Sequence, residues 1–419
     1  MTLIEFFEKS VVENICTSIA HAPDRVILIG YQKNLIQKHV NRYRSFFLKH
    51  GFEIDFQCIT VDKNNVAAIV RVLEEIIEQY PDCIIDVTGG EDLYIFAAGI
   101  VCERHRDKNV QVHYINIRSG VTYDCDMDGV KIAENNPLSY SVSDNISLYG
   151  GRIVYDNEKE DTTHTWDMTE EFKQDIRTMW NICRNDCGAW NWQMDVLSAV
   201  ELYREANSNP LETVAPRAVV SAHMENNGRN GFLFRYDLIN ELIAEGLILS
   251  FEFNRNNPIH IEYKNEQIKR CLTKSGQVLE LIVYLLACEA REKNGNPTYN
   301  DVMTGVFIDW DGEVHDGNEN NEAENEVDVI MMRGMVPIFV SCKNGNVTVD
   351  ELYKLYSVAY KFGGKYAKKV LVAPRIEGNA NVDALRERCS DMQIRIIDNV
   401  EEMNEDKLQK TIKGLWSQY

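Results

Sequence analysis

The first 150 residues alternate between short apolar runs and longer amphipathic stretches. The apolar runs predict strands, and the stretches between them, whose apolar residues recur every three or four positions, predict helices. Gly51 and Pro81 follow two of these stretches and would end the helices. The predicted strands are residues 25–30, 53–60, 83–88 and 110–117, and the predicted helices are residues 35–50, 66–80 and 92–106.

This alternation predicts a parallel, Rossmann-like sheet covered by helices. Such sheets bind ligands beyond the carboxyl ends of their strands. Two predicted strand ends carry polar, glycine-containing loops: Gly30, Tyr31, Gln32 and Lys33 after one strand, and Thr88, Gly89, Gly90, Glu91 and Asp92 after another.

The second loop precedes a predicted helix, so its backbone N–H groups could bind a phosphate. It lacks the Gly-x-Gly-x-x-Gly spacing of dinucleotide-binding folds, which argues against a nicotinamide cofactor. The alternative is that Gly89 and Gly90 only form a tight turn. Both interpretations stand at this point.

Between about residues 151 and 265 the pattern changes to a charged linker, 156–165, and several helices. An amphipathic helix over residues 236–248 runs into strand-like residues near Phe251, an order typical of winged-helix modules. This helix carries Asp237, Glu241 and Glu245, which would repel DNA phosphates. We therefore expect a structural spacer or a dimerisation element here.

From residue 266 onward, a long helix over 276–293 carries Glu280 beside its apolar stripe. A strand at 302–310 and an acidic, Asn-rich segment at 311–325, predicted to be a mobile loop, follow it. Two apolar strands then flank Arg333-Gly334-Met335, which predicts a β-hairpin. The remaining predicted elements are a helix at 349–362, a strand at 369–373, a helix at 382–389 and a strand at 393–397.

Each strand of the predicted hairpin carries a charge that apolar strands rarely contain. Asp328 lies in the first strand, and Lys343 ends the second. An acid and an amine at one end of a sheet could hold a divalent metal and stabilise a phosphate. The alternative is a structural ion pair. Lys365, Lys368 and Lys369 could add positive charge for a nucleic-acid strand.

Composition limits these interpretations. A chain of 419 residues predicts two or three domains. A net charge of -21 argues against a general DNA-coating protein, because such binding depends on clustered Lys and Arg, but leaves a nucleic-acid enzyme with local positive charge or a metal possible. The eleven cysteines form no Cys-x-x-Cys pair and the N-terminus has no signal-like pattern, so we expect reduced thiols in a cytoplasm. No apolar run approaches the roughly 20 residues that span a bilayer, so we expect a soluble protein without a membrane partner.

The first 150 residues resemble a CARF domain, a CRISPR-associated sensor of cyclic oligoadenylates. The resemblance rests on Asp86-Val87-Thr88-Gly89-Gly90-Glu91 and on Ser147-Leu148-Tyr149-Gly150-Gly151. It implies a homodimer whose paired domains hold a ring-shaped oligoadenylate. The loops from Gly30 to Lys33 and from Thr88 to Asp92 would bind the ring, with Asn116 as a further candidate.

The last third resembles the restriction-endonuclease-like, or PD-(D/E)xK, nuclease core, in its order of helix, three strands, helix and strand. The resemblance implies that Asp328 is the metal-binding Asp, Lys343 the motif's Lys, and Glu280 the acid on the first helix. It also implies that the backbone carbonyl of Cys342 is a metal ligand. Ser341 stands where the family has Glu or Asp, so Glu280 or Glu351 would have to supply that charge.

A sensor and a nuclease in one chain resemble the Card/Can-type ancillary nucleases of type III CRISPR systems. The implied domains are a CARF sensor over 1–150, a winged-helix-like connecting domain over 151–265 and a nuclease over 266–419. The implied activity is divalent-metal-dependent cleavage of DNA, RNA or both, with Mn2+ or Mg2+ and with cyclic tetraadenylate as the activator. Two alternatives remain: a CARF-type transcription regulator, and a ring nuclease that degrades its own activator.

Overall fold

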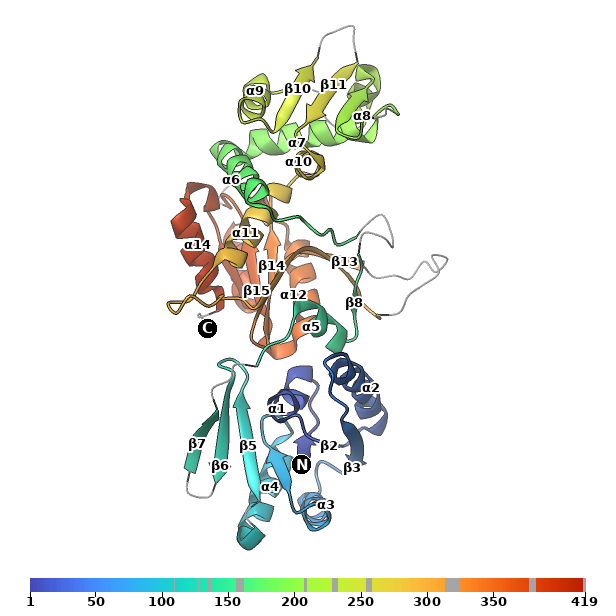
Figure 1. The fold of residues 1–419 in the computed structure, drawn as a ribbon, viewed down its shortest axis with the longest axis vertical. Coiled ribbons are helices and arrows are strands. Elements are labelled where there is room, and N and C mark those ends of the chain that lie inside the picture. Colours follow the sequence, from blue (N-terminus) through green and yellow to red (C-terminus); the bar gives the residue numbers. More distant parts are fainter. Residues whose placement is uncertain are drawn as a thin grey trace.

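The computed structural model describes residues 1–108, 110–126, 129–134, 138–155, 162–206, 209–227, 233–253, 258–312, 324–376 and 382–416. Among these residues, no helix has both the length and the apolar composition needed to cross a membrane. The chain forms three domains stacked along the long axis of the molecule (Figure 1). Each is built around its own β-sheet.

The N-terminal domain contains a seven-stranded sheet in the order β3-β2-β1-β4-β5-β6-β7. The first five strands in this order are parallel, as predicted, and β6 and β7 add an antiparallel hairpin. The strands are β1 (Thr2–Phe6), β2 (Arg25–Gly30), β3 (Asp55–Thr60), β4 (Cys83–Asp86), β5 (Gln111–Asn116), β6 (Val121–Asp126) and β7 (Gly129–Glu134).

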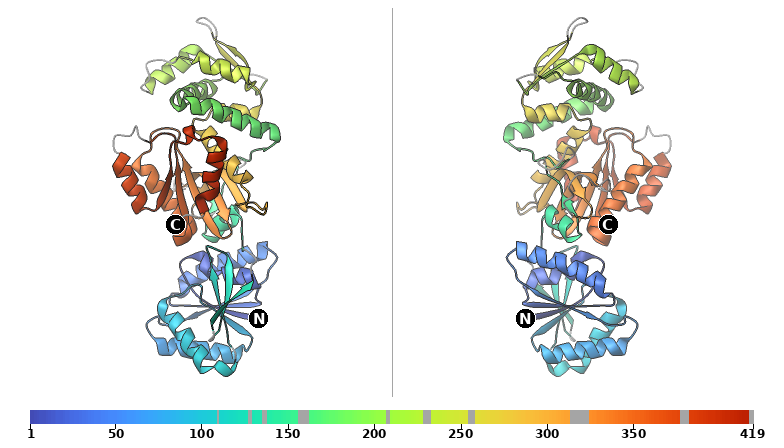
Figure 2. Two further views of the ribbon diagram at one scale, coloured as in Figure 1. Left: turned by 90° about the vertical axis from the view of Figure 1, so that its left-hand side faces the viewer. Right: turned by 90° about the vertical axis from the view of Figure 1, so that its right-hand side faces the viewer.

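Helices cover both faces of this sheet (Figure 2). One face packs against α1 (Cys16–His21) and α2 (Lys33–Lys49), and the other against α3 (Val66–Gln79) and α4 (Asp92–Arg104). The central strand β1 is missing from the sequence-based prediction. It has five residues and is fully buried, and Glu5 interrupts its apolar run, so its pattern is too short and too mixed to indicate a strand.

The connecting domain has the element order of a winged helix. Its two long helices are α6 (Glu170–Asn185) and α7 (Cys187–Leu202). After them come β9 (Glu212–Ala215), α8 (Arg217–Asn226), α9 (Tyr236–Ala244), β10 (Ile248–Glu252), β11 (Ile259–Tyr263) and α10 (Glu266–Leu272). The three strands form an antiparallel sheet in the order β10-β11-β9. Most of the predicted charged linker, residues 156–161, lies outside the described residues.

The C-terminal domain contains a six-stranded sheet in the order β16-β15-β14-β13-β12-β8. The predicted hairpin is confirmed: β13 and β14 pair antiparallel around Gly334, whose φ of 60° suits glycine. The strands are β8 (Arg152–Ile153), β12 (Asp301–Asp309), β13 (Glu324–Arg333), β14 (Val336–Cys342), β15 (Lys368–Val372) and β16 (Ile394–Ile397). Most of the predicted loop at 311–325 lies outside the described residues.

The helices of this domain include α11 (Gln277–Glu289), α12 (Val349–Gly363), α13 (Val382–Asp391) and α14 (Glu405–Lys413). Side chains alternate across its sheet: Val329 and Met331 pack in one core with α11 and the connecting domain. Ile330 and Met332 pack in another core with α12 and part of the N-terminal domain. The sheet is therefore buried on both faces, between the two other domains.

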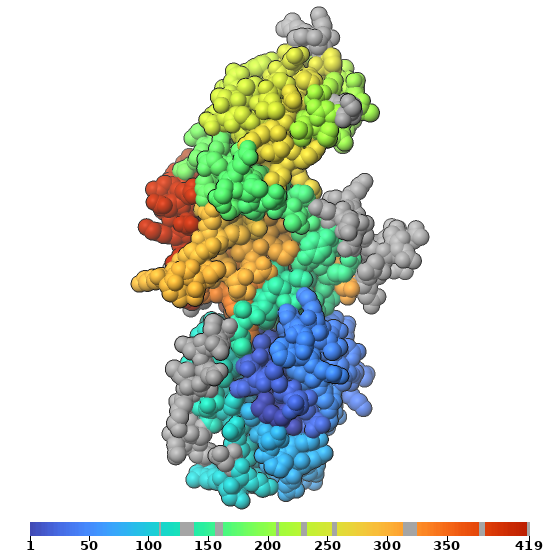
Figure 3. Space-filling model, in the orientation of Figure 1, coloured from blue at the N-terminus to red at the C-terminus, as the bar shows by residue number. Residues whose placement is uncertain are grey.

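The C-terminal domain thus lies between the N-terminal and connecting domains, although it comes last in the sequence (Figures 1 and 3). The connecting domain is not a spacer between the other two, contrary to the sequence-based expectation. Helix α5 (Val142–Leu148) binds the C-terminal domain directly, since the Asn145 side chain donates a 2.6 Å hydrogen bond to the carbonyl of Phe362. Strand β8 follows α5 and pairs with β12.

Candidate functional site

Asp328 lies buried at the open end of the β13–β14 hairpin. Its Oδ2 accepts hydrogen bonds from the Cys342 backbone N–H at 2.6 Å and from the Ser341 hydroxyl at 3.2 Å. The Lys343 Nζ lies 3.6 Å from the same oxygen and 3.7 Å from Glu351 Oε1. Antiparallel pairing of β13 and β14 places the Ser341 hydroxyl beside Asp328.

Glu280, on the first turn of α11, approaches Asp328 closely enough for the two carboxylates to repel each other. Its side chain is buried, and the Gln277 side-chain amide donates a 3.0 Å hydrogen bond to it. Burial and then the Asp328 charge raise the pKa of Glu280 to about 8, although Lys274 opposes the shift. Burial likewise raises the pKa of Asp328. The structure therefore brings together two acidic residues that are 48 positions apart in the sequence.

A third acid, Glu326, lies two positions before Asp328 in β13 and was not among the predicted site residues. Residues two apart in a strand point to the same face. Glu326 forms a 2.6 Å ion pair with Lys274 and raises the pKa values of both Glu280 and Asp328. Because alternate residues of a strand share a face, the position two residues before Asp328 could have identified Glu326 from the sequence.

Asp328 and Glu326 line a cleft of about 350 Å³ between β13, β14 and α12, and Glu280 is not among its lining residues. Burial opposes the charged form of Lys343, but Asp328 and Glu351 outweigh it and raise its pKa, so the amine stays protonated. Glu351 contacts the cleft from the first turn of α12, where it also closes a capping box with Thr348. The cleft is lined by Asn325, Glu326, Val327, Asp328, Val340, Ser341, Lys343, Glu351, Lys354, Leu355 and Val358.

The donors at this site suit a hard cation only in part. Asp328 and Glu280 offer carboxylate oxygens, which Mg2+ and Mn2+ prefer. Burial raises the pKa of the Cys342 thiol well above its usual range, so the thiol stays protonated and only the backbone carbonyl of Cys342 is a plausible ligand. Within the described part of the chain, no three His, Cys, Asp or Glu side chains converge closely enough to hold a metal ion.

The connecting domain holds the residue that follows Lys343. The side-chain amide of Asn344 donates to the Asn191 Oδ1 of α7 at 2.8 Å, and the Asn191 amide donates back to the Asn344 carbonyl. Asn344 is only 7% exposed and also approaches Cys183 Sγ of α6 at 3.4 Å. The end of β14, and with it Lys343, is therefore fixed from the connecting domain.

In the N-terminal domain, the loops after β2 and β4 are linked through Lys63. Its ammonium lies 4.6 Å from the centre of the Tyr31 ring and 3.0 Å from Glu91 Oε1. Gly90 has a φ of 112°, and a Cβ there would lie 2.5 Å from the Cβ of Phe6. The tight turn at Gly90 thus has a packing reason of its own, whether or not the loop binds a ligand.

A row of ionisable side chains crosses four adjacent strands beneath these loops. The strand register aligns Glu5, Asp86, His113 and Asp124. Glu5 and Asp86 are fully buried, and Asp86 accepts a 2.6 Å hydrogen bond from the Thr88 hydroxyl. Burial raises the pKa of Asp86 to about 7 and that of Glu5 well above its usual range.

Asn116 lies next to one other predicted ring-binding residue, because the backbone N–H of the preceding Ile115 donates a 2.8 Å hydrogen bond to the Thr88 hydroxyl. The Asn116 side-chain oxygen accepts hydrogen bonds from the backbone N–H groups of Arg118 and Ser119, both at 3.2 Å, and so shapes the turn between β5 and β6. It lines a different pocket, to which neither the 30–33 loop nor the 88–92 loop contributes.

The N-terminal and C-terminal domains meet through Glu13. This buried carboxylate forms a 2.8 Å ion pair with Lys365 and accepts a 2.7 Å hydrogen bond from the Tyr366 hydroxyl, just after α12 ends. On its other side, Glu13 packs against Gly89, since a Cβ at Gly89 would lie 3.0 Å from the Cβ of Glu13. A continuous path thus runs from the 88–92 loop through Glu13 to α12, which lines the cleft.

No protein-family model and no curated protein matches the sequence. The fold, however, matches solved structures from end to end. VC1899 from Vibrio cholerae aligns over 99% of this chain and 98% of its own, with a TM-score of 0.73 and 16% identity. Can2 from Sulfobacillus thermosulfidooxidans, solved in complex with cyclic tetra-adenylate, aligns over 98% of this chain and 97% of its own, with a TM-score of 0.65 and 17% identity. The predicted fold class and its three-part architecture are confirmed.

Proposed function

We propose that this chain is a nuclease of type III CRISPR defence that a cyclic oligoadenylate activates. The observation that carries the proposal is the cleft lined by Asp328 and Lys343, with the buried Glu280 carboxylate close enough to be repelled by Asp328. Buried acids with raised pKa values, held next to a lysine in a cleft, are typical of a catalytic site. The whole-length likeness to the fold of Can2 supports the same assignment.

The roles of the residues follow from their chemistry. Asp328 and Glu280, with the backbone carbonyl of Cys342, would hold a divalent cation, Mg2+ or Mn2+, and its charge would relieve their mutual repulsion. When bound, such a cation polarises the scissile phosphate and lowers the pKa of a water molecule. Lys343 carries a positive charge at neutral pH and would stabilise negative charge that develops on the phosphate. Glu351 orients the Lys343 ammonium from α12.

Glu326 is our candidate for the carboxylate that Ser341 does not provide. It shares a strand face with Asp328 and its charge acts on both other acids. In the described structure it binds Lys274 at 2.6 Å, so it would have to exchange this partner to approach a cation.

For the N-terminal domain we propose recognition of the ring by the linked loops at residues 30–33 and 88–92. Helix α4 begins at the second loop, and its exposed face carries Leu93 at 39% and Phe96 at 60% exposure. Exposed apolar side chains beside a ligand loop favour a homodimer that pairs two N-terminal domains around one ring. To activate, the ring must bind the active state more tightly than the resting state.

The test is cleavage of DNA and RNA panels by the full-length protein, with and without cyclic tetraadenylate and with Mn2+, Mg2+ or a chelator. We expect cleavage only with both the ring and a metal. Lys343→Ala should reduce the rate by about 100-fold or more, and Glu326→Gln should reduce it as well. Lys410→Ala, an exposed cation on α14, is the matched control. Cleavage that persists in Lys343→Ala or with the chelator would contradict the proposal.

Two other functions have weaker support. A transcription regulator would read DNA with α9, but this helix presents Asp237 and Glu241 to the phosphates. A ring nuclease would need reactive groups at the surface of the N-terminal domain, whereas Glu5 and Asp86 are fully buried. Incubation of the protein with labelled ring, followed by recovery of intact ring, would remove the second alternative.

A further inference from the structure

A second pocket, of about 480 Å³, lies between the N-terminal and C-terminal domains. The turn between β5 and β6 lines one side, and the β13–β14 turn, the start of β15 and Trp416 line the other. Its charged lining residues are all cations: Arg118, Arg333, Lys365 and Lys368. No carboxylate among the described residues lines this pocket, although Lys365 pairs with Glu13 and Arg333 pairs with Glu292 outside the lining.

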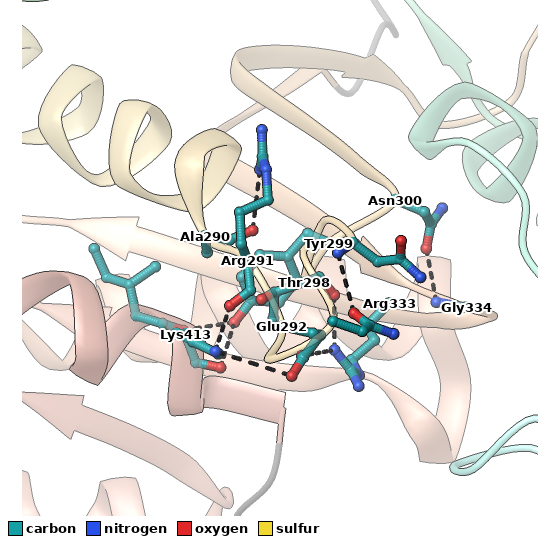
Figure 4. A network of polar contacts seen from close by, with 12 residues as sticks. Ala290, Arg291, Glu292, Thr298, Tyr299, Asn300, Arg333, Gly334 and Lys413 are labelled. Carbon is teal, nitrogen blue, oxygen red and sulfur yellow. Dashed lines mark hydrogen bonds and ion pairs between the residues drawn. The ribbon is translucent and has the colours of Figure 1, made fainter.

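The cations are held in place rather than dispersed in solvent. The Arg333 guanidinium lies 3.5 Å from the centre of the Trp416 ring, and it donates to Glu292 at 2.7 Å and to the Thr298 carbonyl at 2.8 Å (Figure 4). Lys413 also contacts Glu292 at 3.9 Å, from α14. Lys368 donates to the Trp416 carbonyl. These contacts orient the cations before any ligand binds.

The positive charges act on one another. Burial and then the charges of Arg118, Arg395 and Arg333 together lower the pKa of Lys368 to about 8. An anion bound in the pocket would attract each of these cations and so offset the repulsion between them. Asn116 and Ser119 add polar side chains on the N-terminal side. A volume of 480 Å³ is within the range of small-molecule sites and is large enough for a nucleotide.

We propose that this pocket binds the phosphate groups of a nucleotide, and that the bound phosphates join Arg118 of the N-terminal domain to Arg333 and Lys368 of the C-terminal domain. Guanidinium groups suit phosphate because they donate two parallel hydrogen bonds. The phosphates could belong to a free mononucleotide or to a cyclic oligoadenylate, and the chemistry is the same for both. The proposal does not depend on nuclease activity.

The test is isothermal titration of the full-length protein at low salt with pyrophosphate, ADP and cyclic tetraadenylate as separate probes. We expect pyrophosphate and ADP to bind, with affinity that falls as salt rises. Arg118→Gln and Lys368→Gln should each weaken binding by about 10-fold, in line with the loss of one charged hydrogen bond. Arg118→Lys should restore part of it. Lys410→Gln, with the same change of charge outside the pocket, should bind as the wild type does.

Cyclic tetraadenylate distinguishes the two sources of phosphate. If Arg118→Gln weakens the binding of ring and ADP alike, the pocket serves the ring; if it weakens ADP binding alone, the pocket is a separate nucleotide site. Either result supports a phosphate site. No binding of any probe by the wild type, or equal binding by wild type and Arg118→Gln, would overturn the proposal. Arg118 is exposed, so its substitution should leave folding intact, which circular dichroism and the unfolding temperature would check.

Discussion

The Glu13 carboxylate lies 2.8 Å from the Lys365 ammonium, and this ion pair connects the domain that begins the chain to the helix that lines the cleft. Glu13 is 3% exposed and also packs against Gly89 of the 88–92 loop. Any ligand that moves this loop therefore acts on Glu13 first. Lys365 lies two residues beyond α12, whose first turn carries Glu351 at 3.7 Å from Lys343, so we expect a displacement of Lys365 to reach the cleft through this helix.

We expect Glu13→Gln to weaken the coupling between ring binding and cleavage. The amide retains the shape and can still accept from Tyr366, but it loses the charge that holds Lys365. Activation by cyclic tetraadenylate should fall by about 10-fold, a typical coupling free energy, while the affinity for the ring changes little. Rate and affinity are measured separately, by cleavage and by titration. Glu8→Gln, on the other side of Gly89, is the control, and an equal loss there would point to damage of the loop instead.

The exposed face of α4 predicts a dimer contact. Phe96→Glu should convert the protein to a monomer, because a charge cannot be buried in an apolar interface without a partner. Light scattering after size exclusion measures the mass. Tyr236→Glu, on the exposed face of α9, tests the connecting domain as the dimerisation element. A dimer that survives Phe96→Glu and dissociates in Tyr236→Glu would assign dimerisation to the connecting domain.

Asp86 predicts a dependence of stability on pH. Its folded-state pKa of about 7 is above the ordinary value of 3.8, so the folded state binds this proton more tightly than the unfolded state does. The stability contributed by the protonated form is therefore lost as the pH rises from about 4 through 7, by up to about 1.4 kcal/mol per pH unit.

Asp86→Asn has no carboxyl to ionise and can still accept from Thr88. We expect its unfolding temperature, relative to that of the wild type, to rise between pH 5 and pH 8. Asp107→Asn, at an exposed position, should show no such change. If the difference between Asp86→Asn and the wild type is the same at both pH values, the carboxyl does not titrate in this range.

The reciprocal amide contact between Asn191 and Asn344 predicts a positioning role for the connecting domain. Asn191→Ala leaves the buried Asn344 amide with only the weak acceptor Cys183 Sγ and loosens the end of β14. We expect kcat to fall by about 10-fold at unchanged KM, because Lys343 would no longer be held beside Asp328. Asn191→Asp keeps the acceptor oxygen and should retain more activity. A change in thermal stability alone, with unaltered kcat, would indicate a purely structural contact.

The sequence predicted the hairpin well because local pattern determines it: two apolar strands, a glycine that tolerates positive φ, and charges at one end. The same reasoning placed Asp328 and Lys343, and the resemblance to a nuclease core added Glu280, whose charge interacts with both in the structure. The local sequence pattern could not predict the central strand β1, because Glu5 interrupts an apolar run of only five residues. Position in a sheet is set by pairing with distant strands, which no local pattern encodes.

Glu326 and Glu13 show the same limit at the level of single side chains. Both are glutamates in a chain with 65 acidic residues; only the spacing of two from Asp328 sets Glu326 apart, and nothing near Glu13 in the sequence does the same. Their roles depend on partners far away in the chain: Lys274 and Glu280 for the first, Lys365 and Tyr366 for the second. The spatial order of the three domains was likewise hidden, because the chain passes through the C-terminal sheet at β8 before it enters the connecting domain.

Because of strand β8, the three domains cannot be separated by cutting the chain between them. Arg152 and Ile153 form the edge of a sheet whose other strands come from residues 301–397. A fragment that starts at residue 266 would lack this edge and α5, and would expose β12 to pairing with other chains. An exchange of the N-terminal domain would therefore keep the C-terminal sheet intact if the junction lay before α5, so that α5 and β8 stayed with their native partners.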